Sequence, residues 1–425
     1  KFSGIEYLNE TQNFQNNMSI DVNFDPLILN DYFADFVEDN EGFIPLSITY
    51  NYNLKNDNYE VIGEGPTDGL SAFFTFFNLK HNFFQGDLKF QLSGIKKINE
   101  RFELKINTKD LKLFVESRKY NNELSEIIFH SIKSPSQDFS AEIRKKKNFW
   151  KADFSGSNLN LMKFLENNNS TKKNSVPVKF NITTNSLVLK KKKIFVNSFN
   201  GILENSKFSE LNVNFKTQKS VNNDIRIYNE NENKKLSITS DDASEFLNVF
   251  EINPNLKSGT LYVEAERDDD KNYVGNIKVK DFVAYDTPFF AKVLTLFSLD
   301  GIEQKLKDGG IFFNSLNSNF TFSDGDIKFS DGIIRGSDLG LTFKGGFDSY
   351  TDNFQADGTL IPAYTINTLL TSLPVVGDII TAGSPEEGIL AASFELKKEN
   401  EKFDINFNPV SVLVPSLIKN LFKTE

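Results

Sequence analysis

The residue types that most often carry out chemistry are scarce in this chain. It contains no cysteine and two histidines, His81 and His130, which are far apart and show no metal-ligand spacing. Thiol chemistry, zinc ribbons and disulfides are therefore excluded. No serine lies in a G-x-S-x-G nucleophile elbow, and no carboxylate pair stands out from the other acidic residues. The sequence predicts no catalytic residue, no metal site and no cofactor, and we expect a protein that is not an enzyme.

Three segments share part of a ligand-binding motif. The glycines from Gly63 to Gly69 have the wrong final spacing for a dinucleotide loop, and Pro66 removes a backbone donor, so a strand-to-helix turn is the better interpretation. Arg267–Asp270 and the Asp324/Asp326 pair lack the glycine and closing glutamate of a calcium loop. These acidic segments are typical of hairpin turns.

The overall charge disfavours a nucleic-acid partner. The formal net charge is −10 and the pI is about 5.1, whereas nucleic-acid binding needs a concentrated basic surface. The basic runs at residues 144–147 and 190–193 are interpreted as solvated strand ends. The longest uncharged stretch, residues 358–377, is interrupted by Pro362 and Pro374 and is too polar for a membrane-spanning helix.

The elements that organise this chain are indicated by strict two-residue alternation of apolar and polar side chains, the period of a β-strand with one buried face. It recurs from end to end, for example at residues 18–24, 46–54, 88–92, 102–106, 111–115, 150–154, 176–182, 211–215, 261–265, 277–279, 320–322, 327–329, 339–343 and 403–407. Turn pairs such as Asp324-Gly325 and Asp331-Gly332 lie between them. This pattern predicts antiparallel hairpins and meanders rather than a parallel α/β fold.

Segments with a helical period are few and short. They are expected at residues 31–37, 159–165, 243–250, 288–299 and 363–373. The segments starting at Ser157 and Ser240 each carry a Ser/Asp capping signal before Phe-Leu, which indicates a weak internal repeat of several strands and one helix. The polar runs at 167–174 and 229–235 are interpreted as loops or seams between units. We expect an N-terminal β-groove segment at 1–156, a middle repeat unit at 157–239 and a C-terminal region, which carries the motifs described next, at 240–425.

From about Asp241 onward, ordered motifs resemble the C-terminal region of AsmA-like proteins of the Gram-negative envelope. The most specific are residues 358–367 (GTLIPAYTIN), 373–377 (LPVVG), 387–390 (EGIL), 408–411 (NPVS) and 414–417 (VPSL). Earlier motifs in the same order include residues 257–261, 279–288 and 331–336. The likeness spans roughly the last 180 residues, so residues 240–425 are expected to form an AsmA-like C-terminal region, and upstream only the style of alternating strands is similar.

The resemblance implies a mainly β fold: an elongated, twisted antiparallel sheet curled into an open apolar groove of the repeating β-groove type, with a few short helices. It implies a periplasmic protein anchored to the inner membrane by an N-terminal helix that this chain lacks. It further implies movement of phospholipid between the inner and outer membranes, with acyl chains in the groove. Phospholipid, the inner and outer membranes and envelope proteins are the partners that the resemblance implies.

A one-faced sheet must cover its apolar side, and two arrangements would do so. In the first, the face is a groove for acyl chains, because so large an exposed apolar surface marks a ligand or partner site. The expected groove-lining residues are Ile277, Val279, Phe320, Phe322, Ile327, Phe329, Leu341 and Phe343. In the second, the faces pack into a closed β core, and the protein is a non-enzymatic scaffold or envelope-assembly factor.

Two apolar helical stripes near the C-terminus are candidates for contact with a membrane or partner. They comprise Ile366, Leu369, Leu370 and Leu373 before Pro374, and Val414, Leu417, Ile418, Leu421 and Phe422 before the last three residues. An alternative is that both segments fold back as a lid over the end of the sheet, as end caps do in repeat proteins.

Overall fold

The computed structural model describes residues 3–411 apart from 9–13, 34–36, 42–43, 54, 69, 75–78, 84, 136, 161–175, 190–191, 206, 253–254, 270–271, 286–308, 338, 363–389 and 400–401. The chain divides into two compact units, Lys1–Gln218 and Lys219–Glu425. The predicted three-part division, at residues 156/157 and 239/240, remains a prediction from sequence pattern.

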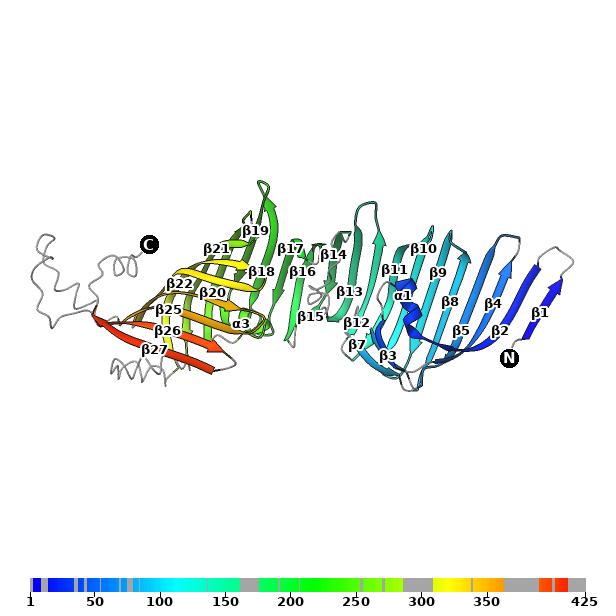
Figure 1. Ribbon diagram of the computed structural model, residues 1–425, viewed down its shortest axis with the longest axis horizontal. Coiled ribbons are helices and arrows are strands. Elements are labelled where there is room, and N and C mark those ends of the chain that lie inside the picture. The colour runs from blue at the N-terminus through cyan, green and yellow to red at the C-terminus, as the bar shows by residue number, and fades with distance from the viewer. Residues whose placement is uncertain are drawn as a thin grey trace, which may run out of the picture. The chain divides into compact units, whose positions relative to one another are not determined.

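The first unit is built from strands that follow one another across a sheet (Figure 1). They are β1 (Ser3–Leu8), β2 (Phe14–Phe24), β4 (Ile44–Asn53), β5 (Asn58–Pro66), β8 (Asp87–Ile95), β9 (Asn99–Asn107), β10 (Lys112–Tyr120), β11 (Glu123–Ser134), β12 (Gln137–Lys145), β13 (Trp150–Asn160), β14 (Val178–Thr184), β15 (Ser186–Leu189), β16 (Lys192–Glu204) and β17 (Lys207–Lys216). Each pairs antiparallel with its neighbour, except that β13 pairs in parallel with β14 and β15, which together continue one line across Asn185.

Between β2 and β8 the chain also forms smaller elements. The 3-10 helix η1 (Pro26–Leu29) leads into the short helix α1 (Asn30–Phe33), and Asp25 caps η1 by accepting a hydrogen bond from the Leu27 backbone at 3.0 Å. The strands β3 (Val37–Glu41), β6 (Leu70–Phe74) and β7 (Leu79–Phe83) form a separate antiparallel sheet.

The second unit contains ten described strands and one described helix. The strands are β18 (Asn222–Glu230), β19 (Asn233–Ser240), β20 (Leu256–Arg267), β21 (Tyr273–Ala284), β22 (Ile311–Ser323), β23 (Asp326–Gly336), β24 (Leu339–Asp348), β25 (Asn353–Pro362), β26 (Leu390–Glu399) and β27 (Lys402–Ser411), each antiparallel to the next. The strand direction turns progressively from β18 to β27, so this sheet twists and curls (Figure 1). The prediction of a mainly β, antiparallel fold with a few short helices is confirmed.

Helix α3 (Ala243–Val249) confirms the capping signal seen in the sequence. The Asp242 carboxylate accepts a hydrogen bond from the Glu245 backbone at 3.1 Å. Ala243, Phe246 and Val249 are buried, and the helix packs on β20. A polar cap and one apolar stripe are what a short amphipathic helix needs to lie on a sheet.

An uninterrupted apolar row crosses the first unit. Directly opposed residues on twelve successive strands are Ile20, Ile48, Gly63, Phe90, Leu104, Val115, Phe129, Ala141, Phe154, Ile182, Phe199 and Val213. Strands lie about 4.8 Å apart, so this row extends on the order of 50 Å. No polar side chain interrupts it, and register therefore places the whole hydrophobic set on one face.

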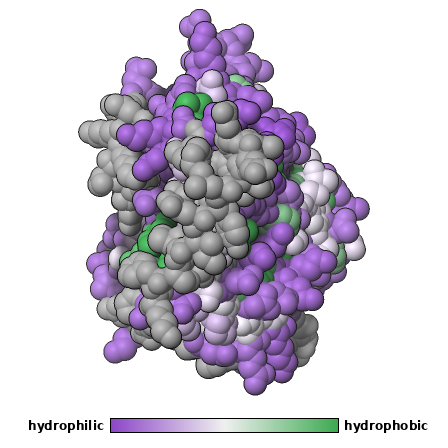
Figure 2. Space-filling view, turned by 90° about the vertical axis from the view of Figure 1, so that its right-hand side faces the viewer, coloured by the Kyte–Doolittle hydropathy of each residue, from purple (hydrophilic) through white to green (hydrophobic). Residues whose placement is uncertain are grey.

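The second unit repeats this arrangement across its ten strands. The inner apolar row consists of Ile227, Leu236, Ala265, Gly275, Phe320, Phe329, Gly345, Ala356, Leu396 and Ile405. In the view from the side that lies at the right in Figure 1, the described outer surface is mostly hydrophilic, and apolar side chains show only in small areas (Figure 2). Within each unit, the strands that carry these rows thus have one apolar and one polar face.

Two predicted turns have different outcomes. Asp324 and Gly325 have φ of 44° and 94° and connect β22 to β23, as predicted. The turn predicted at Asp331-Gly332 is wrong, because both residues lie inside β23, where the pairing with β24 shifts register between Phe329 and Gly332. Asp-Gly is a residue pair typical of turns, but Asp331 lies in a β-bulge, where it has a positive φ of 51°.

Three further expectations are corrected or limited. Residues 63–69 do not lead into a helix, because β5 ends at Pro66 and β6 begins at Leu70. The helix expected at 159–165 cannot begin at Leu159, which belongs to β13; its remainder and the helices expected at 288–299 and 363–373 lie outside the described residues. The polar run 229–235 is the tip of the β18–β19 hairpin, where Asn231 and Glu232 have positive φ.

On the polar face of the first unit, charged side chains from β9 to β12 form a connected network. Glu116 is 1% exposed and accepts hydrogen bonds from Arg101 and Arg118, both at 2.7 Å. Arg118 also contacts Glu126 at 3.0 Å, and Glu126 in turn contacts Arg144 at 2.5 Å. Because each contact joins adjacent strands or adjacent rows, the network ties these strands together on the side opposite the apolar row.

Burial alone would raise the pKa of Glu116, but hydrogen bonds from Arg101, His130 and Arg118 outweigh it and lower that pKa to about 2. A carboxyl group with a lowered folded-state pKa stabilises the fold above its unfolded pKa of about 4.3, and this contribution is lost as the pH falls toward the folded value.

We expect Glu116→Gln to lower the free energy of unfolding of the first unit by about 1–3 kcal/mol at pH 7, because it leaves two arginines without their shared carboxylate. The difference from the wild type should shrink between about pH 4 and pH 2. Denaturant unfolding followed by the fluorescence of Trp150, the single tryptophan, measures this. The more exposed Glu142→Gln is the matched control and should cost under about 1 kcal/mol. Equal losses for both variants would contradict the assigned role of Glu116.

Candidate functional site

All eight residues predicted to line a groove lie on one face of the second unit. Phe320 opposes Phe329, and Phe322 opposes Ile327, in the β22–β23 pair. Val279 opposes Leu316, which opposes Ile334 and then Leu341, so these residues share the same face. Ile277 and Phe343 fall on it by strand alternation. The sequence therefore identified a set that register brings together.

The side chains of this set are covered to different degrees. Val279, Phe320 and Leu341 are 7%, 8% and 4% exposed, whereas Phe322 is 36% exposed. Ile277, Ile327, Phe329 and Phe343 are half-buried. The Phe329 and Phe343 rings lie 6.3 Å apart in an edge-to-face arrangement. Apolar side chains that remain half-covered near the hairpin ends of the strands leave an apolar surface for another occupant.

Sequence reasoning missed the small members of the face. Gly275, Gly345 and Ala356 lie in the inner apolar row beside Phe320 and Phe329, but glycine and alanine give no clear signal of alternation. A Cβ at Gly345 would lie 2.2 Å from the Gln355 carbonyl oxygen, so the backbones of β24 and β25 approach closely there. Only the strand register could have identified these positions.

In the first unit, part of the corresponding face is occupied by the chain itself. Leu29 and Phe33, from η1 and α1, are 2% and 3% exposed. The Tyr32 ring stacks on Phe102 with centroids 4.5 Å apart, and Phe33 meets the same ring edge-on at 5.4 Å. Phe102 also stacks on Phe90 at 5.7 Å. Helix α1 therefore rests on the apolar face of β8 and β9 through one aromatic cluster.

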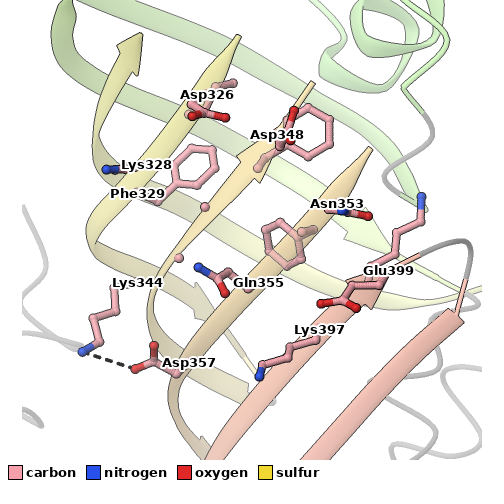
Figure 3. A pocket seen from close by; sticks show the side chains of 16 residues that line it. Asp326, Lys328, Phe329, Lys344, Asp348, Asn353, Gln355, Asp357, Lys397 and Glu399 are labelled. Carbon is pink, nitrogen blue, oxygen red and sulfur yellow. Dashed lines mark ion pairs between the residues drawn. The ribbon is translucent and has the colours of Figure 1, made fainter. Parts of the chain in front are cut away.

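A hollow of about 670 Å³ lies at the ends of β23–β26. Its lining includes the cross-strand row Lys328–Gly346–Gln355–Lys397, the directly opposed residues Asp326, Asp348 and Asn353, and Glu399 on β26. The lining also includes residues of the opposite, apolar face, namely Ile327, Phe329, Phe347, Phe354 and Lys398. Lys344 pairs with Asp357 at 3.4 Å, and the ammonium groups of Lys328 and Lys344 lie apart from one another (Figure 3). This mixture of separated charges does not form a catalytic constellation.

The histidine whose side chain the structure describes, His130, is engaged in structural contacts. His130 stacks on Phe114 at 4.3 Å, and its Nε2 lies 3.3 Å from Glu116. Within the described ranges, no three His, Cys, Asp or Glu side chains gather so as to hold a metal ion. No helix in the described part of the chain is long and apolar enough to cross a membrane.

The residues predicted to contact a membrane or partner lie outside the described residues. They are Ile366, Leu369, Leu370, Leu373, Val414, Leu417, Ile418, Leu421 and Phe422. Their role stays a prediction.

Comparison with protein-family models, with curated proteins and with solved structures finds no match for this chain. The resemblance to AsmA-like proteins therefore rests on the sequence motifs alone.

The aromatic cluster under α1 generates a stability prediction. Phe102→Ala should lower the free energy of unfolding of the first unit by about 3–5 kcal/mol, because it removes the ring on which Tyr32, Phe33 and Phe90 pack. Tyr120→Ala, at a position 62% exposed on the neighbouring strand, should cost about 0.5 kcal/mol or less. Denaturant unfolding monitored at Trp150 tests both variants, and a small loss for Phe102→Ala would mean that α1 is not held there.

Proposed function

We propose that this protein is a non-enzymatic, lipid-binding conduit that takes part in phospholipid transport between the inner and outer membranes, with acyl chains held against the apolar faces of its sheets. The observation that carries the proposal is the uncharged row in each unit, on twelve strands and on ten. Acyl chains need a surface that is apolar along a continuous line, whereas a compact ligand would need only a local pocket. The proposed location is the periplasm, as the AsmA-like motifs imply.

A closed β core is the competing function, in which the protein is a scaffold or envelope-assembly factor. It is supported by the deep burial of Phe129 and Phe215, which are 2% and 0% exposed, and by the packing of α1 and α3 on the sheets. The half-buried Phe329 and the 36% exposed Phe322 favour the open face in the second unit. A charge placed on that face separates the two possibilities.

Phe329→Asp should reduce the phospholipid that co-purifies with the protein several-fold while leaving the β circular dichroism largely unchanged, because a carboxylate on an open face repels acyl chains but stays hydrated. Ser330→Asp adds the same charge to the next, exposed residue on the polar face and should leave lipid occupancy unchanged. Quantitative mass spectrometry of extracted lipid measures the effect. Global unfolding of Phe329→Asp would favour the closed core, since a buried unpaired charge is strongly destabilising.

A passive carrier returns its cargo unaltered. Purified protein incubated with radiolabelled phospholipid should therefore release it with no new labelled product on thin-layer chromatography. Hydrolysis that co-elutes with the protein through successive purification steps would contradict a non-enzymatic role, and a boiled sample controls for spontaneous breakdown.

A further inference from the structure

One margin of the apolar face in the second unit differs from the rest of that face in its residue types. At the hairpin ends of the strands, a row of directly opposed residues crosses all eight strands from β20 to β27: Arg267, Tyr273, Phe322, Ile327, Phe347, Phe354, Lys398 and Phe403. We call it the hairpin-end row. Lys234, two residues before Leu236 on β19, lies on the same face at the same end. The row thus combines aromatic rings with cations and contains no acidic residue.

The cations of this row are held among the aromatic side chains. The Lys398 side chain is 18% exposed although its neighbours along the row are Phe354 and Phe403. Burial raises the pKa of Tyr273, and the positive charge of nearby Arg267 opposes that rise. Phe322 and Phe403 are 36% and 49% exposed. The Lys398 side chain thus lays its apolar stem along the face and directs its charge to Asp352 at the margin.

Moving inward by two residues, about 7 Å along each strand, the row becomes entirely apolar or glycine from Ala265 to Ile405. Moving outward, every described hairpin turn at this end carries an acid: Glu232, Asp268 and Asp269, Asp324, and Asp352. Asp352 makes an ion pair with Lys398, directed from the turn to the row. The order from the groove outward is therefore apolar, cationic, anionic.

The opposite margin of the same face is different. Leu256, Ala284 and Ile311 oppose one another there, and Leu339 lies at the same end of β24. Ile311 and Leu339 are 0% exposed. Among the described residues of these two margins, the charged side chains thus lie at the hairpin ends alone, so a bound amphiphile would have a single favoured direction across the strands.

We propose that the hairpin-end row and the acidic turns beyond it select zwitterionic phospholipids whose headgroup ends in an ammonium. This inference rests on the proposed function. Acyl chains lie on the inner apolar row, and the hairpin-end row offers two separate phosphate positions, one beside Arg267 on β20 and one beside Lys398 on β26, each with an acidic turn beyond it for the ammonium. Beside the Lys398–Asp352 ion pair, the phosphate of such a headgroup faces Lys398 and its ammonium faces Asp352, so opposite charges lie next to one another. An anionic headgroup with no ammonium would bring its outer hydroxyls to the same acids and gain less.

The size of the preference follows from exposure. The turn acids Glu232 and Asp269 are exposed, and ion pairs at exposed sites contribute roughly 0.2–1 kcal/mol each. Two such contacts should favour the ammonium-bearing lipid by about threefold at low salt. The same exposure makes the preference sensitive to screening.

The test loads the full chain from vesicles of equimolar phosphatidylethanolamine and phosphatidylglycerol with identical acyl chains, at low and high salt, and measures the ratio of the two lipids bound. Wild-type protein should hold about a threefold excess of phosphatidylethanolamine at low salt. Glu232→Gln/Asp269→Asn should bring the ratio close to one. The matched control Glu395→Gln/Asp404→Asn removes the same charge from exposed polar-face positions and should keep the wild-type ratio. Arg267→Gln should lower the total of both lipids.

The outcomes separate this inference from the proposed function. Equal binding by the wild type, an excess of phosphatidylglycerol, or a preference that persists at high salt would overturn the headgroup selection while leaving lipid binding in place. No bound lipid of either kind would instead contradict the proposed function. The salt comparison on the wild type requires no substitution, so it decides the question even where a variant fails to fold.

Discussion

The structure depends on keeping one continuous apolar face of each sheet away from water. Row after row of Phe, Leu, Ile and Val on one side of the strands removes apolar area from water only if something covers that side. The first unit covers part of it with α1 on Phe102, and the second covers part of it with α3 on β20. Phe322 and Phe403 are left partly exposed by the rest of the chain, and there an external apolar partner would keep the face away from water.

The polar face follows from the same constraint. Because strand alternation sends every second side chain to the other face, the charges of Arg101, Glu116, Arg118 and Glu126 gather on that face. Arg118 lies directly opposite Glu126, and Glu116 contacts Arg101 diagonally across the strands and Arg118 two residues along its own strand. Their contacts are specific to register, so a slip by one residue would both expose the apolar row and break the ion pairs. The two faces therefore enforce the same alignment.

The sequence alone predicts the strands because alternation is a local property, and it predicts the cap of α3 because Asp242 and Glu245 are three residues apart. It failed where two local signals conflict: Asp331-Gly332 has the residues of a turn but sits in a bulge. The strands β13 and β14 pair in parallel and so are not the two arms of a hairpin. Nothing in the sequence of either strand indicates this pairing.

For the candidate site, the sequence identified large side chains such as Phe320 and Phe343 but not the order in which rows succeed one another. Arg267, Phe354 and Lys398 are separated by tens of residues, and only the register of several strand pairs places them in one line. Considered one at a time, Arg267 and Lys398 look like ordinary charged residues at the ends of hairpins. A margin of this kind is a property of the sheet and not of any strand.

The pairing of each strand with its neighbour in the chain also shapes how the molecule reaches its native state. Most strand contacts join segments only one hairpin apart, so little loop entropy is lost at each step and assembly can begin at any hairpin and spread to the next. Spreading must wait for a longer loop to close at three junctions: β13–β14, where Trp150 pairs with Val178, β21–β22, where Ala284 pairs with Ile311, and β25–β26, where Leu360 pairs with Ala392. During synthesis, the strands before each of these junctions would accumulate as a finished sheet ahead of those after it.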